Sequence, residues 1–132
     1  LKKLRDENRT KIINKLLSSK KWDSQFKFID IPKNLAPSWM GLPILLDKKY
    51  ISKKQRFVDY LDKNGIETRP IISGNFLNHP AAKLYKLNKN KLLFKNAQIV
   101  QNLGFLIGLH TKRITNQQLR LLHDCFFDID KI

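Results

Sequence analysis

Four residues whose types could bind a small anionic ligand lie within positions 68–80, namely Arg69, Gly74, Asn75 and His79. The local pattern puts Arg69 at the end of an expected strand and the other three in the following loop, and such loops commonly carry binding groups. An arginine can fork onto a phosphate or carboxylate, and a Gly-Asn pair lets the backbone approach a ligand closely. An ordinary turn with a surface arginine is the competing interpretation, and the residue types by themselves favour it slightly.

Two further side chains have plainer interpretations. Trp39, beside Gly41, could present its ring to a ligand, although a core tryptophan is the default. Cys125 belongs to a Cys-Phe-Phe sequence on an expected terminal helix, where a buried and inert thiol is typical. We therefore predict a structural role for Cys125 and keep Trp39 among the candidate ligand contacts.

The histidines and carboxylates indicate neither a metal site nor acid–base catalysis. His79, His110 and His123 are scattered along the sequence, and none has a Cys or His neighbour at the spacing of a metal motif. Asp and Glu total 11, and most fall on expected helix surfaces. We expect no catalytic residue and no metal ligand in this chain.

The formal charge of +15 raises the possibility of a basic module that binds nucleic acid or another polyanion. However, 20 of the 26 basic residues are Lys and six are Arg, whereas reading of base edges depends mainly on Arg. Lys, Asn and Ile together make 45 of the 132 residues, the set that A/T-rich codons favour. Compositional bias on a solvated surface explains the charge better, so a nucleic-acid partner remains the alternative hypothesis.

Length and composition indicate one globular domain, because 132 residues with 42% hydrophobic content can bury a substantial core. No apolar run approaches the roughly 18 residues that a membrane helix needs. The polar start of the chain does not have the apolar centre of a secretory leader. A single cysteine excludes an internal disulfide, so we expect a cytoplasmic location and no membrane partner.

Residues that cap or end helices and strands divide the chain into helical and extended segments. Their order predicts an α+β fold, with a small sheet of about three strands packed with helices. Ser52 with Gln55 and Thr115 with Gln118 have capping-box spacing at helix starts, and Gly65 is a helix stop. We expect helices at 1–19, 52–64, 96–103 (closed by Gly104) and 115–127, and a helical turn at 79–82. We expect strands at 38–46, 66–72 and 105–109, an extended stretch at 26–31, and a mobile segment at 84–93. The proline within 38–46 predicts a position near a sheet edge.

The order of these pieces resembles the C-terminal domain of the DegT/DnrJ/StrS sugar aminotransferases over nearly the whole chain. Within that family it is most similar to the branch with the nucleotide-linked 4-keto-6-deoxyhexose 3-dehydratases. The segments that carry the resemblance are 5–9 (Arg-Asp-Glu-Asn-Arg), 37–43 (Pro-Ser-Trp-Met-Gly-Leu-Pro), 61–70 (ending in Glu-Thr-Arg-Pro), 74–76 (Gly-Asn-Phe), 79–81 (His-Pro-Ala), 96–97 (Asn-Ala) and 105–110 (Phe-Leu-Ile-Gly-Leu-His).

The resemblance implies the small C-terminal domain of a fold-type I pyridoxal phosphate (PLP) enzyme that acts as a homodimer. Residues 1–132 would form this single domain, and the large N-terminal domain that holds PLP would lie outside the chain. PLP would then be bound by the complete enzyme and not by this domain alone. The partners would be that large domain and a nucleotide-linked sugar, in the synthesis of deoxy or amino sugars for a surface polysaccharide such as lipopolysaccharide.

The resemblance also suggests roles for the candidate residues. Arg69 would bind a substrate phosphate or fix the Gly74-Asn75 loop, and Asn75 and His79 would bond sugar or phosphate oxygens. Trp39 would support the loop from beneath. The chain has no counterpart of the cofactor lysine, or of the histidine that replaces it in dehydratases, so transamination and dehydration both remain open.

Overall fold

In the computed structural model, which describes residues 1–87 and 93–132, four strands form one antiparallel sheet in the order β1-β2-β4-β3. The strands are β1 (Phe26–Phe28), β2 (Gly41–Leu46), β3 (Thr68–Arg69) and β4 (Gly104–Gly108). The helices are α1 (Lys2–Leu17), α2 (Lys54–Lys63), α3 (Ala81–Leu84), α4 (Lys95–Leu103) and α5 (Asn116–Phe127). Short 3-10 turns cover Lys48–Tyr50, Phe76–Asn78 and Asp128–Asp130. The α+β class predicted from the sequence is confirmed.

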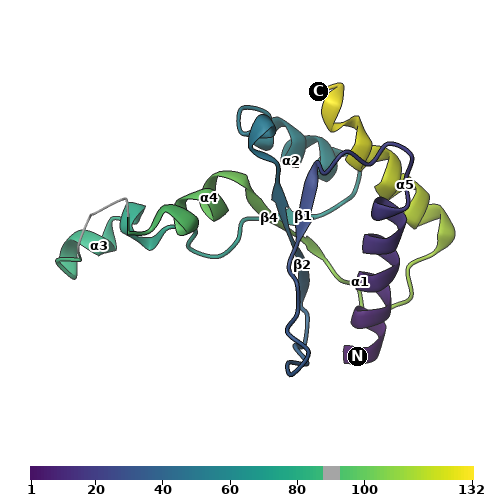
Figure 1. Cartoon of the computed structure of the whole chain (residues 1–132), viewed down its shortest axis with the longest axis horizontal. Coiled ribbons are helices and arrows are strands. Elements are labelled where there is room, and N and C mark those ends of the chain that lie inside the picture. Colours follow the sequence, from purple (N-terminus) through teal and green to yellow (C-terminus); the bar gives the residue numbers. More distant parts are fainter. Residues whose placement is uncertain (88–92) are drawn as a thin grey trace.

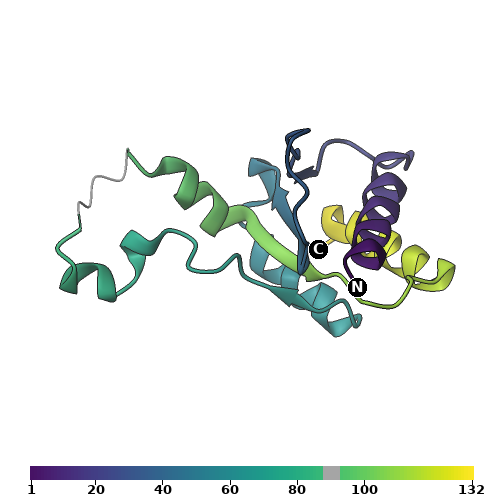
Figure 2. The same cartoon turned by 90° about the horizontal axis from the view of Figure 1, so that it is seen from below.

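One face of the sheet forms the core. Along β2 the residues Leu42, Ile44 and Leu46 are buried and alternate with half-exposed neighbours, which is the pattern of a strand with one covered face. Apolar residues of α1, α2 and α5 belong to the same buried cluster as these strand residues. Figures 1 and 2 show α1 beside α5 next to the sheet, whereas α3 and α4 extend away from it.

Four phenylalanine rings from four elements meet at the centre of this core. Phe26 of β1 and Phe57 of α2 lie 5.0 and 5.8 Å from Phe126 of α5, measured between ring centroids. Phe105 of β4 lies 5.9 Å from Phe57. These separations suit favourable edge-to-face and offset packing of aromatic rings. The cluster therefore fixes α2 and α5 against the first and third strands of the sheet order.

The position of β2 corrects one expectation, because this strand lies between β1 and β4 and not at the edge. Its proline is tolerated for a local reason. The pairing with β1 extends only over Ile44–Leu46, so Pro43 lies beyond the end of that ladder. At Pro43 the β1 side of the strand is therefore unpaired, and that edge needs no backbone N–H donor there.

The observed helix boundaries confirm some of the predicted caps and stops and contradict others. Thr115 and Gln118 form the predicted capping box, with reciprocal bonds of 3.2 and 2.9 Å, and Gly65 ends its helix with φ +79°. The Ser52–Gln55 capping box is wrong. Residues 51–53 form a turn between the 3-10 turn capped by Asp47 and α2, and Lys53 before the helix is already helical (φ −98°, ψ −13°). Ser52 is therefore not at the N-cap, and Gln55 instead donates to Asp59.

Two further expectations need adjustment. The strand expected at 66–72 is limited to Thr68–Arg69. Gly104 follows the last residue of α4, but it is extended and begins β4. A Cβ at Gly104 would lie 2.5 Å from the Val100 carbonyl oxygen. Glycine is needed here because a side chain would collide with the end of α4, and not because the backbone is left-handed. The mobility expected for 84–93 stays a prediction, since 88–92 lie outside the described residues.

Asn8 of α1 ties the helix to the loop that leads from β4 to α5. Its side chain is 2% exposed. The amide donates to the carbonyl oxygens of His110 (3.0 Å) and Lys112 (2.8 Å), and its oxygen accepts from the Ile114 N–H (3.0 Å). One buried side chain therefore satisfies three backbone groups of a loop that has no other regular structure.

The turn that follows α5 is held by tyrosines of the neighbouring segment. Tyr60 of α2 donates to Asp128 at 2.7 Å, and Tyr50 donates to Asp130. The Asp128 bond raises the pKa of Tyr60 to about 12. Bonds from Lys131 and then Tyr60 lower the pKa of Asp128 below its ordinary 3.8.

Cys125 of α5 is buried as predicted, and burial raises the pKa of its thiol.

Among the helices in the described part of the chain, none combines the length and apolar character required to cross a bilayer.

We predict that Asn8→Ala lowers the free energy of unfolding by about 2–4 kcal/mol, because it removes three hydrogen bonds that a buried side chain makes to the backbone of the loop. Urea unfolding measures this quantity. Asn14→Ala, at an exposed position of the same helix, is the matched control and should stay within about 0.5 kcal/mol of wild type. Equal effects of the two substitutions would contradict the role given to Asn8.

We also predict that Tyr60→Phe costs about 1–2 kcal/mol of unfolding free energy at neutral pH, because it removes a hydrogen bond to a carboxylate. The folded pKa of Asp128 is depressed, so this contribution is present above the ordinary carboxyl pKa and is lost as pH falls through the folded value. The folded pKa of Tyr60 is raised, so the contribution persists to about pH 10 and is lost toward pH 12. Thermal unfolding across pH, with exposed Tyr85→Phe as control, measures the difference; a pH-independent gap between Tyr60→Phe and wild type would refute it.

Candidate functional site

The loop after β3 turns sharply at two consecutive left-handed residues. Ser73 has φ +64° and Gly74 has φ +49°, and the Gly74 N–H closes the turn on the Ile71 carbonyl at 3.0 Å. A positive φ is uncommon for a residue with a side chain, and such strain concentrates at functional sites. A Cβ at Gly74 would lie 2.8 Å from Cγ of Gln101, so this position has neither the conformation nor the space for another residue.

Two glutamines of α4 hold this loop. Oε1 of Gln101 accepts the Asn75 backbone N–H at 2.9 Å, and Oε1 of Gln98 accepts from the Asn75 side chain at 3.1 Å. The amide of Asn78 donates to both glutamine oxygens, at 2.7 Å to Gln98 and 3.0 Å to Gln101. Oδ1 of Asn75 accepts the Leu77 N–H at 3.1 Å. With Asn75 only 4% exposed, its amide is engaged within the protein and positions the loop.

A hollow of about 270 Å³ lies where this loop meets the start of β4. Its lining residues come from the loop and from the end of α4, and they are Pro70, Ile71, Ser73, Gly74, Val100, Gln101 and Gly104. Lys54 of α2 reaches the same end of α4, where its ammonium donates to the Gln101 carbonyl at 3.4 Å and burial lowers its pKa. The hollow therefore offers polar loop atoms beside apolar surface.

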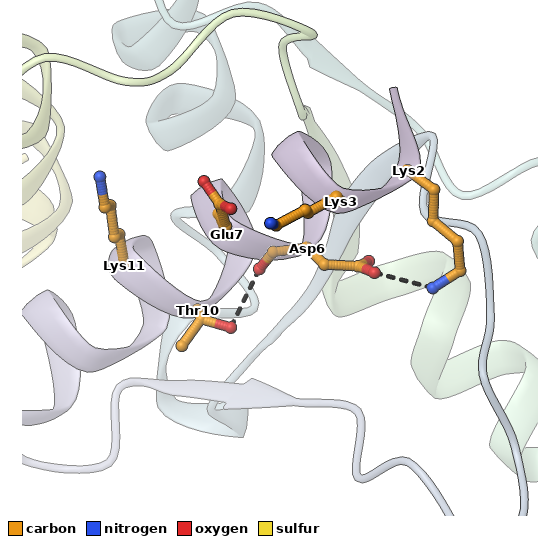
Figure 3. Close-up of a pocket in the computed structure, with 6 residues that line it drawn as sticks. All are labelled: Lys2, Lys3, Asp6, Glu7, Thr10 and Lys11. Atoms are coloured by element: carbon orange, nitrogen blue, oxygen red, sulfur yellow. Dashed lines mark hydrogen bonds and ion pairs between the residues drawn. The ribbon is translucent and has the colours of Figure 1, made fainter.

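A larger hollow, of about 740 Å³, runs along α1 and has a different character. Figure 3 shows that its lining residues all project from this one helix, and they are Lys2, Lys3, Asp6, Glu7, Thr10 and Lys11. The Lys2 ammonium pairs with the Asp6 carboxylate at 2.7 Å, and Thr10 donates back to the Asp6 carbonyl. One face of one helix does not enclose a ligand, so we place the candidate site at the smaller hollow.

Arg69 and His79 border the loop without facing its glutamine anchors. The Arg69 side chain is 73% exposed and bonds Glu67 through Nη2 at 2.6 Å and Nε at 3.0 Å. The His79 ring stacks on Phe76 at 5.6 Å, and its Nδ1 accepts the Ala81 N–H at 3.2 Å. Both side chains are accessible, in contrast to the buried amide of Asn75.

Trp39 lies at the end of β4 opposite to the loop hollow. It precedes Gly41, which pairs with Gly108, whereas the loop hollow includes Gly104 at the other end of the strand. Four residue steps of an extended strand span roughly 14 Å. The ring of Trp39 is half-buried and carries the Arg9 guanidinium 5.0 Å from its centroid. In this structure Trp39 does not lie beneath the loop.

His123 is a helix residue with more partners than a surface position requires. Its Nε2 lies 2.9 Å from Ser19 Oγ and its Nδ1 lies 2.9 Å from Asp124. Serine, histidine and aspartate in this order suggest a hydrolytic triad, but Ser19 Oγ also accepts the Lys21 N–H. Neither hollow described above includes these residues. The contact joins the turn after α1 to α5, and we assign it no reaction.

The two hollows and the metal-ligating side chains of the described residues can be compared with the needs of PLP and of a metal ion. None of their His, Cys, Asp and Glu side chains gather in a group of three or more that could hold a metal. The larger hollow is an open helix face, and the smaller one is lined by neither a lysine nor a carboxylate. PLP needs a lysine or its replacement together with an acidic partner for its ring nitrogen. The two hollows therefore do not fit PLP.

We predict that Gly74→Ala speeds amide exchange at Asn75 by about ten-fold, because the new Cβ displaces Gln101 and removes one hydrogen bond. Gly65→Ala is the matched control, since it also places alanine at positive φ but its Cβ would meet nothing within 4 Å. Hydrogen exchange followed by NMR resolves this single amide. The explanation fails if the two substitutions leave Asn75 exchange equally unchanged.

None of the protein-family models matches the sequence, and no curated protein matches it. Solved structures do match. A GDP-4-keto-6-deoxymannose-3-dehydratase (ColD) with bound GDP-perosamine aligns with a TM-score of 0.68 and 23% identity, over 93% of this chain and 30% of that chain. The E. coli GDP-4-keto-6-deoxy-D-mannose-3-dehydratase with bound hydrated PLP gives 0.67 and 25%, over 93% and 30%.

A second kind of enzyme shares the fold. The sugar aminotransferase CalS13 from Micromonospora echinospora aligns with a TM-score of 0.69 and 13% identity, over 97% of this chain and 30% of that chain. The present chain thus spans about a third of the length of the enzymes it matches. It has the fold found in PLP-dependent sugar enzymes of the DegT/DnrJ/StrS kind, the group that its sequence resembles.

Proposed function

We propose that this chain is the small C-terminal domain of a PLP-dependent sugar-nucleotide aminotransferase or dehydratase, and that it closes the active site over the nucleotide sugar. The observation that carries the proposal is the coverage of the structural matches. The matches to a dehydratase and to an aminotransferase extend over 93% and 97% of this chain but over only 30% of each enzyme. A unit that recurs in enzymes of both kinds suits a binding role that both reactions need.

In this proposal the cofactor is held outside the chain, by a large N-terminal domain. Neither hollow of the described residues fits PLP, which supports that placement. When bound in the complete enzyme, PLP supplies an electron sink for reactions at the sugar ring. The residues of this chain contribute by binding the substrate, holding a loop in place and excluding water.

The Arg69 region is suited to an anionic substrate. Its ion pair with Glu67 is exposed on both sides, at 73% and 67%, and such pairs contribute little to stability. A phosphate can therefore replace Glu67 on the guanidinium at small cost and accept two parallel N–H bonds. His79 lies in the same loop segment with its Nε2 edge available for a sugar or phosphate oxygen, while Asn75 fixes the loop.

The wider setting belongs to the same proposal. A complete enzyme of this kind would act as a homodimer in the cytoplasm and supply deoxy or amino sugars for a surface polysaccharide. The sequence offers no residue that selects between transamination and dehydration, because that choice depends on a lysine or histidine beside the cofactor. Both reactions need a loop that covers the same nucleotide-linked substrate.

We predict that Arg69→Ala in the complete enzyme weakens nucleotide-sugar binding by roughly ten- to a hundred-fold, because a charge-assisted bond to phosphate contributes about 1.5–3 kcal/mol. Retention of PLP should not change. Arg69→Lys should restore only part of the affinity, since lysine cannot form the fork. Calorimetric titration gives the affinity, the absorbance of bound PLP gives the retention, and thermal melting detects loss of fold.

Arg120→Ala, at an exposed position of α5, is the matched loss of one positive charge and should leave affinity unchanged. If a folded Arg69→Ala enzyme binds the nucleotide sugar with wild-type affinity, Arg69 is not part of the site. If the complete enzyme retains no PLP, the proposed function is wrong.

A further inference from the structure

The elements around α3 and α4 form an arm whose surface is unusually apolar. We define the arm as the described residues within 72–102. Figures 1 and 2 both show it extending away from the sheet and the three core helices. Within α3 only Ala82 is buried, while Leu84 is 82% exposed and Tyr85 69% exposed. The large apolar side chains exposed on the arm are Ile72, Phe76, Leu84, Tyr85, Leu87, Leu93 and Phe94.

This surface requires a partner for a physical reason. Single exposed apolar residues are ordinary, but a gathering of large ones on one projecting segment marks an interaction surface. Half of the large apolar residues that are exposed in the described part of the chain belong to this arm. The core elements bury their own apolar faces, and none of the residues that the structure describes covers these arm side chains.

The charge of the arm narrows the choice of partner. From Thr68 to His123 the sequence contains no Asp or Glu, although it contains nine Lys and Arg residues. Two arms would therefore repel each other, which argues against arm-to-arm pairing of two copies. A complementary face has an apolar centre for the leucine and aromatic side chains and acidic residues at its rim for Lys83 and Lys86.

We propose that the arm docks on the cofactor-bearing part of the complete enzyme, at an apolar face with an acidic rim. This inference rests on the proposed function. The matched enzymes are about three times as long as this chain, so most of such an enzyme is available to cover the arm. Phe76, which stacks on His79, belongs to the same exposed surface, so docking also covers the 73–79 loop and its hollow.

Hydrogen exchange of peptides from 72–87 tests the docking, compared between the complete enzyme and the 132-residue chain alone. Docking predicts exchange at least ten-fold slower in the complete enzyme. The double variant Leu84→Asp/Tyr85→Asp should restore fast exchange there and leave exchange of β2 and β4 unchanged. Because both side chains are exposed in the isolated chain, its melting temperature should not fall.

Leu121→Asp is the matched control, since Leu121 is an exposed leucine (46%) on α5, and it should leave the arm protected. Lys83→Glu/Lys86→Glu should weaken the protection, and the wild-type protection should decrease with added salt. Equal exchange of the arm in the chain and in an enzyme that retains PLP would overturn the docking and leave the proposed function standing. Absence of PLP from the complete enzyme would overturn both.

Hydrogen exchange also distinguishes docking on the enzyme from the alternative that the arm binds nucleic acid. A 20-nucleotide single-stranded RNA, titrated into the isolated chain, should give no protection of 72–87 at physiological salt. Protection of the arm by this RNA, abolished by the Lys83→Glu/Lys86→Glu variant, would overturn the proposal in favour of a polyanion-binding arm.

Discussion

The contact among Phe26, Phe57, Phe105 and Phe126 is the interaction on which the other elements depend. Each ring comes from a different element, so the cluster exists only when β1, α2, β4 and α5 are in place together. Its position fixes the end of α2, and Gly65 then turns the chain directly into β3. The loop that follows β3 can therefore meet α4 at a defined place, which is why distant glutamines anchor it.

Local signals explain which parts of the fold could be predicted from the sequence. Thr115 with Gln118 and the left-handed Gly65 act within a few residues of themselves, so their roles follow from spacing alone. The inner position of β2 depends on its pairing with β1 on one side and β4 on the other, and no local pattern contains that information. The Ser52–Gln55 spacing failed because the backbone is already helical at Lys53, so Ser52 does not occupy the N-cap position that the spacing assumed.

The candidate site was partly predictable for a related reason. The Gly-Asn pair indicated a sharp loop, and the structure gives Gly74 a positive φ there. The anchors Gln98 and Gln101 were missed, although two polar residues three apart on an expected helix are a signal for a shared face. Trp39 became a candidate because it lies beside Gly41, and only strand register reveals that it is at the end of β4 opposite to the loop hollow.

The shortness of the outer strands has a consequence for how copies of the chain behave at high concentration. An unpaired strand edge is a template on which another chain can add a strand and begin aggregation. Here β1 offers three residues and β3 only two, the latter followed directly by Pro70, which has no N–H to donate. Pro43 likewise interrupts the part of β2 that extends beyond β1. Each side of the sheet thus offers only a short template for intermolecular strand addition, even before any other part of a larger protein has folded around it.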